Sequence, residues 1–149
     1  MANVDTSHGY FGIRIPKIEF SEWYARDDVK NNPHRNQPGV YIIARFVHKP
    51  EGTADYNAKE ILCVGETTRD IHTRLKQFFR AAKNGKTNHN PGKKFFRKFS
   101  GNLDNIYVAS FSPELEEEHC LDPFIRYLER KLILEYAIKH GSIPFCNSE

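Results

Sequence analysis

The sequence predicts an α+β fold, in which helices flank a central three-stranded antiparallel sheet in one small domain. Three runs rich in β-branched and aromatic residues predict the strands, at 40–47, 60–64 and 105–111. Two stretches with apolar residues at helical spacing predict the main helices, at 70–83 and 122–140. The order strand, strand, helix, short helix, strand, helix is typical of a small α+β domain. A chain of 149 residues is long enough for one such domain with its own core.

The residues before the first of these strands form a separate stretch of the chain. We expect 1–37 to be an N-terminal extension packed on the domain, which itself spans 38–149. Within the extension, 11–20 is expected to hold a short strand and 20–29 a short helix. A Pro-Gly pair at 38–39 marks the turn into the domain.

The first half of the domain reads as a hairpin followed by a helix. The strands at 40–47 and 60–64 are joined by a modest polar loop, which predicts antiparallel pairing. Asp70 is the predicted N-cap of the helix that follows. Apolar residues then recur at i, i+4, i+7, i+8 and i+11, which places them on one face: Ile71, Leu75, Phe78, Phe79 and Ala82.

The second half of the domain contains a short basic helix, a strand and a long helix. Lys and Arg alternate with Phe over 93–99, which predicts the short helix, with its Phe side chains in the core rather than exposed for base stacking. Asp122 is the predicted N-cap of the long helix, with Pro123 at its first position. Gly141 is its predicted terminator.

Apolar content and cysteine usage indicate the compartment. No apolar run approaches the ~20 residues that a membrane span needs. The three cysteines, Cys63, Cys120 and Cys146, are odd in number and widely spaced, which argues against a disulfide framework. We therefore expect a soluble cytoplasmic protein.

Charge is distributed very unevenly along the chain. The net charge is +3, but 69–98 contains ten Lys and Arg and only one acid, Asp70, while 114–122 is strongly acidic. A charge run by itself more often marks a solvated helix face than a binding site. Beside a phosphate-handling site, however, a basic segment of this kind indicates a polyanionic partner.

One carboxylate in the last predicted helix lies on a largely apolar face, where a charged group is energetically unfavourable. Glu129 has Ile125 at i−4 and Leu132 at i+3, so it projects from a largely apolar face. Such a group needs an ion-pair partner or a bound metal, and the spacing leaves both possibilities open. By contrast, Glu135 has Lys131 and another lysine one turn away on either side, as expected for a solvated ion pair.

Several short motifs, in order, resemble those of the GIY-YIG nuclease superfamily over 39–147. They are Gly39-Val40-Tyr41, Cys63-Val64-Gly65, the helix bearing Arg74 and Leu75, Leu128-Glu129 in the last helix, and Pro144 with Asn147. The resemblance implies a small GIY-YIG-like domain and metal-dependent hydrolysis of a DNA phosphodiester.

The resemblance also implies a role for each matching residue. Glu129 would bind one divalent cation, Mg²⁺ or Mn²⁺, at the scissile phosphate, which suits a hard cation and an oxygen ligand. Arg74 would contact that phosphate through its guanidinium group. Tyr41 would position or deprotonate the attacking water, and Asn147 would help to hold the active-site strands. The basic residues expected to contact DNA are Arg69, Lys76, Arg80, Lys83, Lys86, Lys93, Lys94, Arg97 and Lys98.

The chain departs from the family pattern at three residue positions, and Arg74 falls one residue later after Gly65 than is usual. Cys63 stands where the family has its second Tyr, Phe78 stands where a His or Tyr is common, and Glu66 replaces a frequent Lys. A thiol cannot reproduce the reach or acidity of a phenol, and Phe transfers no proton. Glu66 and, less favourably, His72 are candidates to compensate.

Three functions are consistent with these observations. The first is an active DNA endonuclease, which would need a homodimer, a partner protein or two successive events to cut both strands. The second is a catalytically weakened nucleic-acid-binding module. The third is a subunit that regulates a partner nuclease through its acidic segment at 114–122.

Overall fold

The computed structural model describes residues 4–10, 13–86 and 89–147. Its strands are β1 (Val4–Tyr10), β2 (Ile13–Pro16), β3 (Tyr24–Ala25), β4 (Gly39–Arg45), β5 (Ile61–Thr67) and β6 (Ile106–Phe111). Its α-helices are α1 (Ile71–Asn84), α2 (Asn90–Phe99) and α3 (Leu121–His140), and short 3₁₀ helices are η1 (Arg26–Asn31), η2 (Glu118–Cys120) and η3 (Phe145–Asn147). The expected α+β class is confirmed.

The central sheet has four antiparallel strands, in the order β3-β6-β4-β5, rather than the three expected. The additional strand, β3, lies within 20–29, where a short helix was predicted, and that prediction was wrong. Phe20 and Trp23 are buried in the core, so they hold this segment extended beside β6. Only η1, which follows β3, is helical here.

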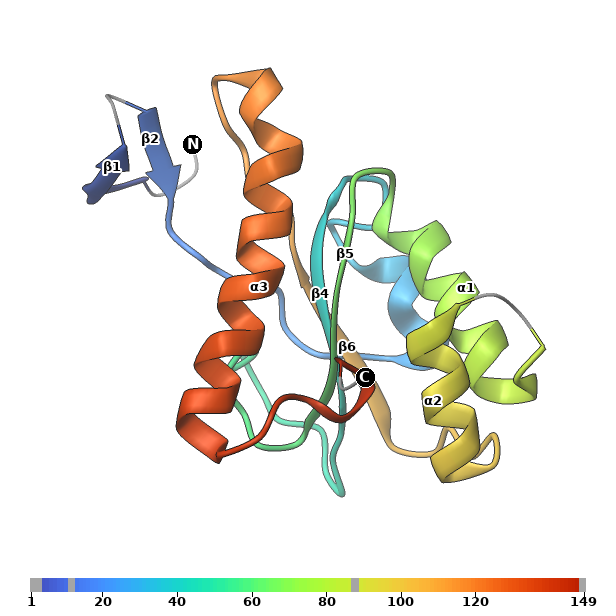
Figure 1. The fold of residues 1–149 in the computed structure, drawn as a ribbon. Coiled ribbons are helices and arrows are strands. Elements are labelled where there is room, and N and C mark those ends of the chain that lie inside the picture. The colour runs from blue at the N-terminus through green and yellow to red at the C-terminus, as the bar shows by residue number, and fades with distance from the viewer. Residues whose placement is uncertain (1–3, 11–12, 87–88, 148–149) are drawn as a thin grey trace.

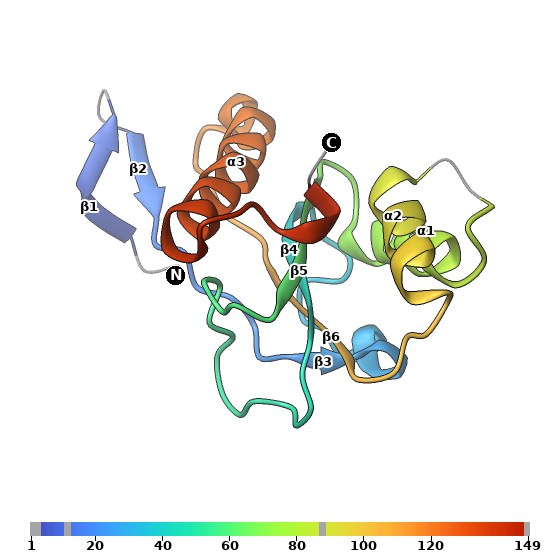
Figure 2. The same ribbon diagram turned by 60° about the horizontal axis from the view of Figure 1, so that its bottom comes forward.

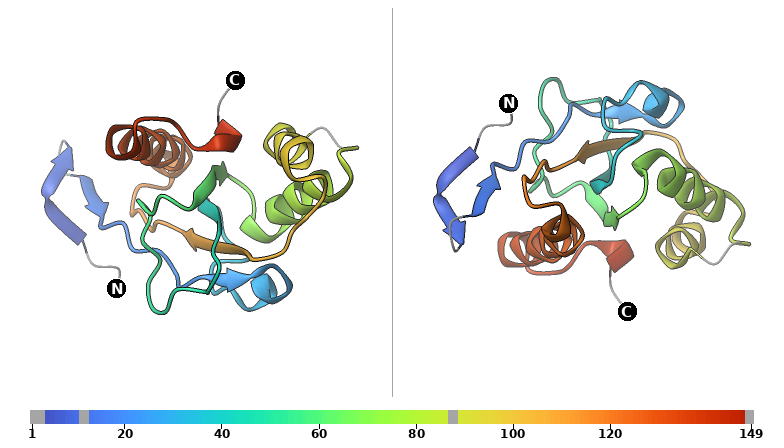
Figure 3. Two further views of the ribbon diagram at one scale, coloured as in Figure 1. Left: turned by 90° about the horizontal axis from the view of Figure 1, so that it is seen from below. Right: turned by 90° about the horizontal axis from the view of Figure 1, so that it is seen from above.

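Helices cover both faces of the sheet, with α3 on one side and α1 and α2 on the other (Figures 1 and 3). Alternate residues of β4 therefore enter different cores. Val40 and Ile42 pack in the cluster that contains the buried residues of α3, whereas Tyr41 and Ile43 pack in the cluster of α1 and α2. A strand covered on both faces is apolar throughout, which explains its continuous apolar sequence.

The helix boundaries agree with the predictions to within one residue for α1 and α3 but not for α2. The Asp70 carboxylate accepts a hydrogen bond from the Thr73 backbone N–H at 2.7 Å, which confirms the predicted N-cap of α1. The α2 helix begins at Asn90 rather than at 93, because the His89 side chain caps it. The α3 helix begins at Leu121, directly after η2, so Asp122 is not its N-cap. Gly141 ends α3 in a left-handed conformation, as predicted.

The N-terminal residues divide into two parts. Strands β1 and β2 pair with each other in a separate two-stranded sheet. This hairpin lies on the α3 side of the molecule, away from α1 and α2 (Figures 1 and 2). The later residues, with Phe20 and Trp23, belong to the core of the main sheet. Within the described residues, no helix combines the length and apolar character of a transmembrane span.

Strand β5 forms an outer edge of the sheet, and the chain after α3 crosses this edge. Residues of α3 pack on one face of the sheet, but Cys146 of η3 is buried in the cluster on the other face. The backbone between them passes along β5, so this edge is partly covered by the C-terminal segment (Figure 1). The candidate site lies farther along the same edge.

Candidate active site

Tyr41 lies across the backbone of the edge strand. It is directly opposite Gly65 in the register of β4 and β5, and the two therefore share one face of the sheet. A Cβ atom at Gly65 would lie 2.3 Å from Tyr41 Cζ and 2.4 Å from its Oη, so only glycine leaves room for the ring. The Tyr41 side chain thus spans β5 and brings its hydroxyl group to the sheet edge.

Arg74, in the first turns of α1, meets Tyr41 at this edge. The Arg74 guanidinium donates a hydrogen bond to the Tyr41 hydroxyl and a second, of 3.2 Å, to Gln77 Oε1. Burial nevertheless raises the pKa of Tyr41 to about 12, because desolvation of the phenolate outweighs the attraction of Arg74. Tyr41 is therefore protonated at neutral pH.

Glu129 reaches the same electrostatic environment from α3. Its side chain is only 21% exposed, and its ion contact within the described residues is to Arg130 Nε at 3.9 Å. Burial raises the pKa of the Glu129 carboxyl group, and the Glu66 carboxylate raises it further. Glu135, on the outer face of α3, forms an ion pair with Lys131, as the spacing predicted.

Glu66, near the end of β5, is the fourth charged or polar group here. It lies opposite Val40 and thus on the α3 face of the sheet. Glu66 Oε2 is buried and has no hydrogen-bond partner in the described part of the chain. Glu66 also lines, with Arg69 and Arg74, a cavity of about 340 Å³ between the end of β5 and the start of α1.

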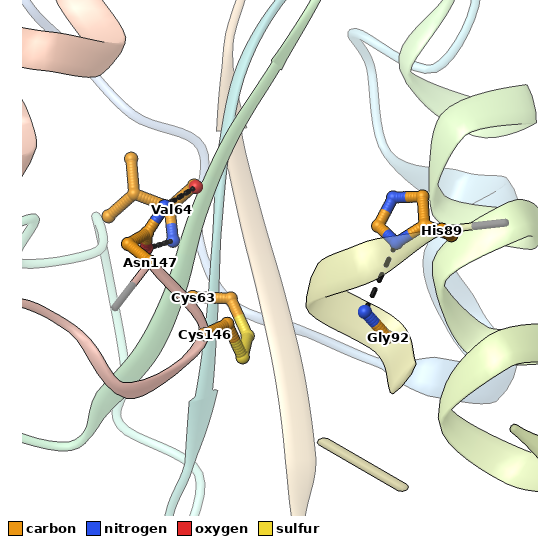
Figure 4. The surroundings of a disulfide bond; sticks show 6 residues. All are labelled: Cys63, Val64, His89, Gly92, Cys146 and Asn147. Atoms are coloured by element: carbon orange, nitrogen blue, oxygen red, sulfur yellow. Dashed lines mark hydrogen bonds between the residues drawn. A yellow bond between two sulfur atoms is a disulfide. The ribbon is translucent and has the colours of Figure 1, made fainter. Parts of the chain in front are cut away.

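Cys63, at the position of the family's second tyrosine, is paired in a disulfide, although the number and spacing of the cysteines argued against a disulfide framework. Cys63 and Cys146 form a disulfide between β5 and η3 and are both buried (Figure 4). Asn147, the next residue, accepts a hydrogen bond from the Val64 backbone N–H at 2.9 Å and donates one to the Val64 carbonyl at 2.8 Å. The C-terminal segment is therefore joined to β5 both covalently and by paired hydrogen bonds.

The other positions considered for proton transfer are occupied by structural residues. Phe78 is fully buried between α1 and α2 and contacts the His89 ring. The His72 backbone N–H donates to Arg35 O at 2.9 Å, while its Nδ1 atom is buried and unpartnered within the described residues.

His89 was missed by the sequence analysis. It is 5% exposed, and its Nδ1 accepts a hydrogen bond of 3.1 Å from the Gly92 backbone N–H (Figure 4). Desolvation first, and the Arg74 charge second, lower the pKa of His89 to about 4, so the ring is neutral. Pro91, at the second position of α2, is the signal that places the helix start here.

The predicted DNA-contacting residues lie on or beside the α1–α2 pair. Lys76, Arg80 and Lys83 are exposed on α1, and Lys86 is exposed just beyond it. On α2, Arg97 and Lys98 are exposed, whereas Lys93 and Lys94 are half-buried. Arg69 is exposed at the rim of the cavity that Arg74 also lines. As predicted, Phe95 is buried, and Phe99 packs against the same core.

The fold thus brings together Tyr41, Arg74 and Glu129, as predicted from the motifs, and Glu66 lies with them. Cys63 and Phe78 are instead buried in the core. The charges of Arg74, Glu129 and Glu66 all act on the pKa of Tyr41, so the four side chains lie within electrostatic range of one another. No protein-family model, curated protein sequence or solved structure matches this chain.

Proposed function

We propose that the chain is a divalent-metal-dependent endonuclease that hydrolyses DNA phosphodiester bonds. The observation that carries this proposal is the convergence of Tyr41, Arg74 and Glu129 at one sheet edge. They come from β4, α1 and α3, and Arg74 also lines a cavity of about 340 Å³ at the end of β5. A phenol, a guanidinium and a largely buried carboxylate form a suitable set for phosphoryl chemistry.

Glu129 is the residue proposed to hold Mg²⁺ or Mn²⁺. Within the described residues, no group of three or more Asp, Glu, His or Cys side chains could hold a metal alone. Mg²⁺, however, is usually bound through one or two carboxylates, with water and substrate phosphates completing its ligands. The buried, unpartnered Oε2 of Glu66 supports the fit of a cation here. When bound, the cation would polarise the phosphate and stabilise the leaving alkoxide.

Arg74 and Tyr41 are proposed to orient the reacting groups. Arg74 lines the cavity and supplies a fixed positive charge with several donors, which suits a phosphate oxygen. Tyr41 is protonated at neutral pH, because its pKa is raised to about 12. We therefore assign Tyr41 the role of a hydrogen-bond donor that positions the attacking water or the phosphate, not that of the general base.

The exposed basic residues of α1 and α2 are proposed to bind the DNA backbone. Those of α1 lie on the helix that carries Arg74 and lines the cavity, and α2 packs against α1. Contacts of this kind position a duplex without reading its sequence. One such site cuts one strand, so cleavage of both strands would require a homodimer, a partner protein or two events.

The test is cleavage of supercoiled plasmid and of branched and flapped DNA in Mg²⁺ or Mn²⁺. We expect nicking by the wild-type chain, loss of at least about 100-fold in Glu129→Gln, and no change in Glu135→Gln. The control residue lies on the same helix but in a solvated ion pair. Normal cleavage by Glu129→Gln would refute the assignment of the site.

A second function is favoured by two observations. Cys63 is in a disulfide and Phe78 is buried, so neither position supplies the proton-handling group found there in the family. A nucleic-acid-binding module that has lost cleavage would bind DNA in a metal-free buffer yet leave every substrate intact with Mg²⁺ or Mn²⁺. Absence of both binding and cleavage would instead favour a regulatory subunit that uses the acidic segment at 114–122.

A further inference from the structure

We propose that Glu66 is a second carboxylate ligand for the divalent cation, acting together with Glu129 from across the gap between β5 and α3. This inference rests on the proposed function only in assuming that a cation binds at Glu129. In the nuclease motif this position does not bind metal and is frequently a lysine. The inference comes instead from the position and surroundings of Glu66.

The first support is the position of Glu66 in the sheet. It follows Gly65, over which the Tyr41 ring lies, and it precedes the end of β5. Its register partner Val40 packs in the α3 core, so the Glu66 side chain leaves the strand on the side of the helix that carries Glu129. The two carboxylates therefore approach each other across the gap between β5 and α3.

The second support is the unsatisfied state of the Glu66 carboxylate. Its Oε2 atom is buried, and no hydrogen-bond donor is within reach in the described part of the chain. No ion pair within 4 Å connects Glu66 to a Lys or Arg among the described residues either. A buried carboxylate oxygen without a partner is costly, and a bound cation is one of the few ways to compensate that cost.

The third support is the charge balance of the pair. Glu66 lies on β5 and Glu129 on α3, and these two elements pack against each other. Within the described residues, the ion contact of Glu129 is to Arg130, which is 3.9 Å away and has a largely exposed side chain. A divalent cation between the two carboxylates would satisfy both, and its hard character suits oxygen ligands.

The fourth support is access for substrate. Glu66 lines the cavity of about 340 Å³ together with Arg69 and Arg74. A cation held by Glu66 would therefore face the space in which Arg74 can bind a phosphate. A carboxylate and a guanidinium in the lining of one cavity suit a metal-bound phosphodiester, because the two charges address the cation and the phosphate separately.

The test measures cation binding rather than cleavage. Mn²⁺ is titrated into the full chain and followed by calorimetry and by loss of the free Mn²⁺ electron paramagnetic resonance signal. The variants are Glu66→Gln, Glu129→Gln and the double variant, with half-buried Glu60→Gln as a control close in sequence. Far-ultraviolet circular dichroism and Tm verify folding, and Glu66→Asp tests whether a shorter carboxylate restores part of the binding.

We expect Mn²⁺ affinity to fall at least about tenfold in each single variant and little further in the double variant, as for two ligands of one ion. Wild-type affinity in Glu66→Gln would overturn the proposal. If the free chain binds no Mn²⁺, the titration is repeated with a duplex whose phosphorothioate linkages resist cleavage, and absence of binding there also overturns it.

The outcome is separable from that of the proposed function. Cation binding that depends on both carboxylates, without cleavage of any DNA, would support Glu66 as a ligand and refute the nuclease. Cleavage that depends on Glu129 but is unaffected in Glu66→Gln, with unchanged Mn²⁺ affinity, would leave the nuclease standing and refute the role of Glu66.

Discussion

The Tyr41 hydroxyl oxygen lies so close to Gly65 that a methyl group on Gly65 would come within 2.4 Å of it. The two residues face each other across β4 and β5, so this contact is set by strand register rather than by a flexible side chain. Tyr41 can reach Arg74 only because the intervening strand has no side chain at this point.

Gly65→Ala is therefore expected to expel the Tyr41 ring from the sheet edge. Overpacking of a close contact typically costs about 1–3 kcal/mol, and we expect a loss of that size in the free energy of unfolding, measured with urea. Cleavage should fall more steeply than stability, because the Tyr41–Arg74 hydrogen bond would be broken.

The variant Tyr41→Ala tests whether the loss of stability in Gly65→Ala comes from the steric clash between these two residues. If the clash is responsible, Gly65→Ala should cost little in a Tyr41→Ala background, so the two substitutions would be non-additive. Additive losses would show that Gly65 is required for some other reason.

His89 should make stability depend on pH between about 4 and 6.5. Its folded-state pKa of about 4 lies below the ordinary 6.5, so within this window the unfolded chain binds the proton and the folded chain does not. The stabilisation is fully present above pH 6.5 and is lost as the pH falls through the window. Its size is no more than about 3.5 kcal/mol for such a difference in pKa.

Urea unfolding at several pH values, compared between wild type and His89→Asn, isolates this contribution. Asn retains an N-cap acceptor for α2 but does not titrate. His34, whose pKa is also lowered by burial, contributes equally to both proteins and cancels in the difference. Parallel pH profiles for the two proteins would show that His89 is not the source.

The disulfide between Cys63 and Cys146 should stabilise the fold by about 2–5 kcal/mol. It closes a loop between residues 83 apart, and long loops benefit most from a cross-link in the chain-entropy account. We expect dithiothreitol to lower the urea midpoint of the wild type but not that of the Cys63→Ser/Cys146→Ser double variant.

Cys120→Ser provides the matched control, since Cys120 forms no disulfide. Alkylation with mass spectrometry, before and after reduction, would count the thiols directly. Three alkylated thiols in the unreduced protein would contradict the pairing.

The exposed basic residues of α1 should dominate the salt dependence of DNA binding. With about four phosphate contacts, log K should fall with log salt at a slope near −4. Replacing Lys76, Arg80 and Lys83 by Ala should make that slope shallower by about 1 per lost contact. Fluorescence anisotropy in EDTA measures binding without cleavage.

Lys139→Ala is the control, because this exposed lysine lies near the end of α3 rather than on α1 or α2. An unchanged slope in the triple variant, or an equal change in Lys139→Ala, would place the DNA elsewhere.

The helices and strands whose sequence patterns involve only neighbouring residues could be predicted from the sequence. The helical spacing of Ile71, Leu75 and Phe78 and the cap at Asp70 depend on neighbouring residues, and α1 was predicted accurately. The apolar runs of β4 and β6 were equally informative, because burial on both faces leaves a continuous apolar segment.

The features that sequence could not reveal depend on contacts between distant residues. Strand β3 has two residues and no periodicity, and it is held by the burial of Trp23 and by pairing with β6. The pairing of Cys63 with Cys146 requires the C-terminal segment to cross β5. Glu66 was read as a departure from a motif, because only the three-dimensional arrangement brings it near Glu129.

The two hydrogen bonds between Asn147 and Val64 also have a consequence for self-association. An outermost strand with open N–H and C=O groups can add a strand from another molecule and so begin aggregation. Here a side-chain amide occupies both groups of Val64, and the disulfide beside it holds that amide in place. The C-terminal segment therefore protects the strand that carries Gly65 and Glu66 from edge-to-edge polymerisation.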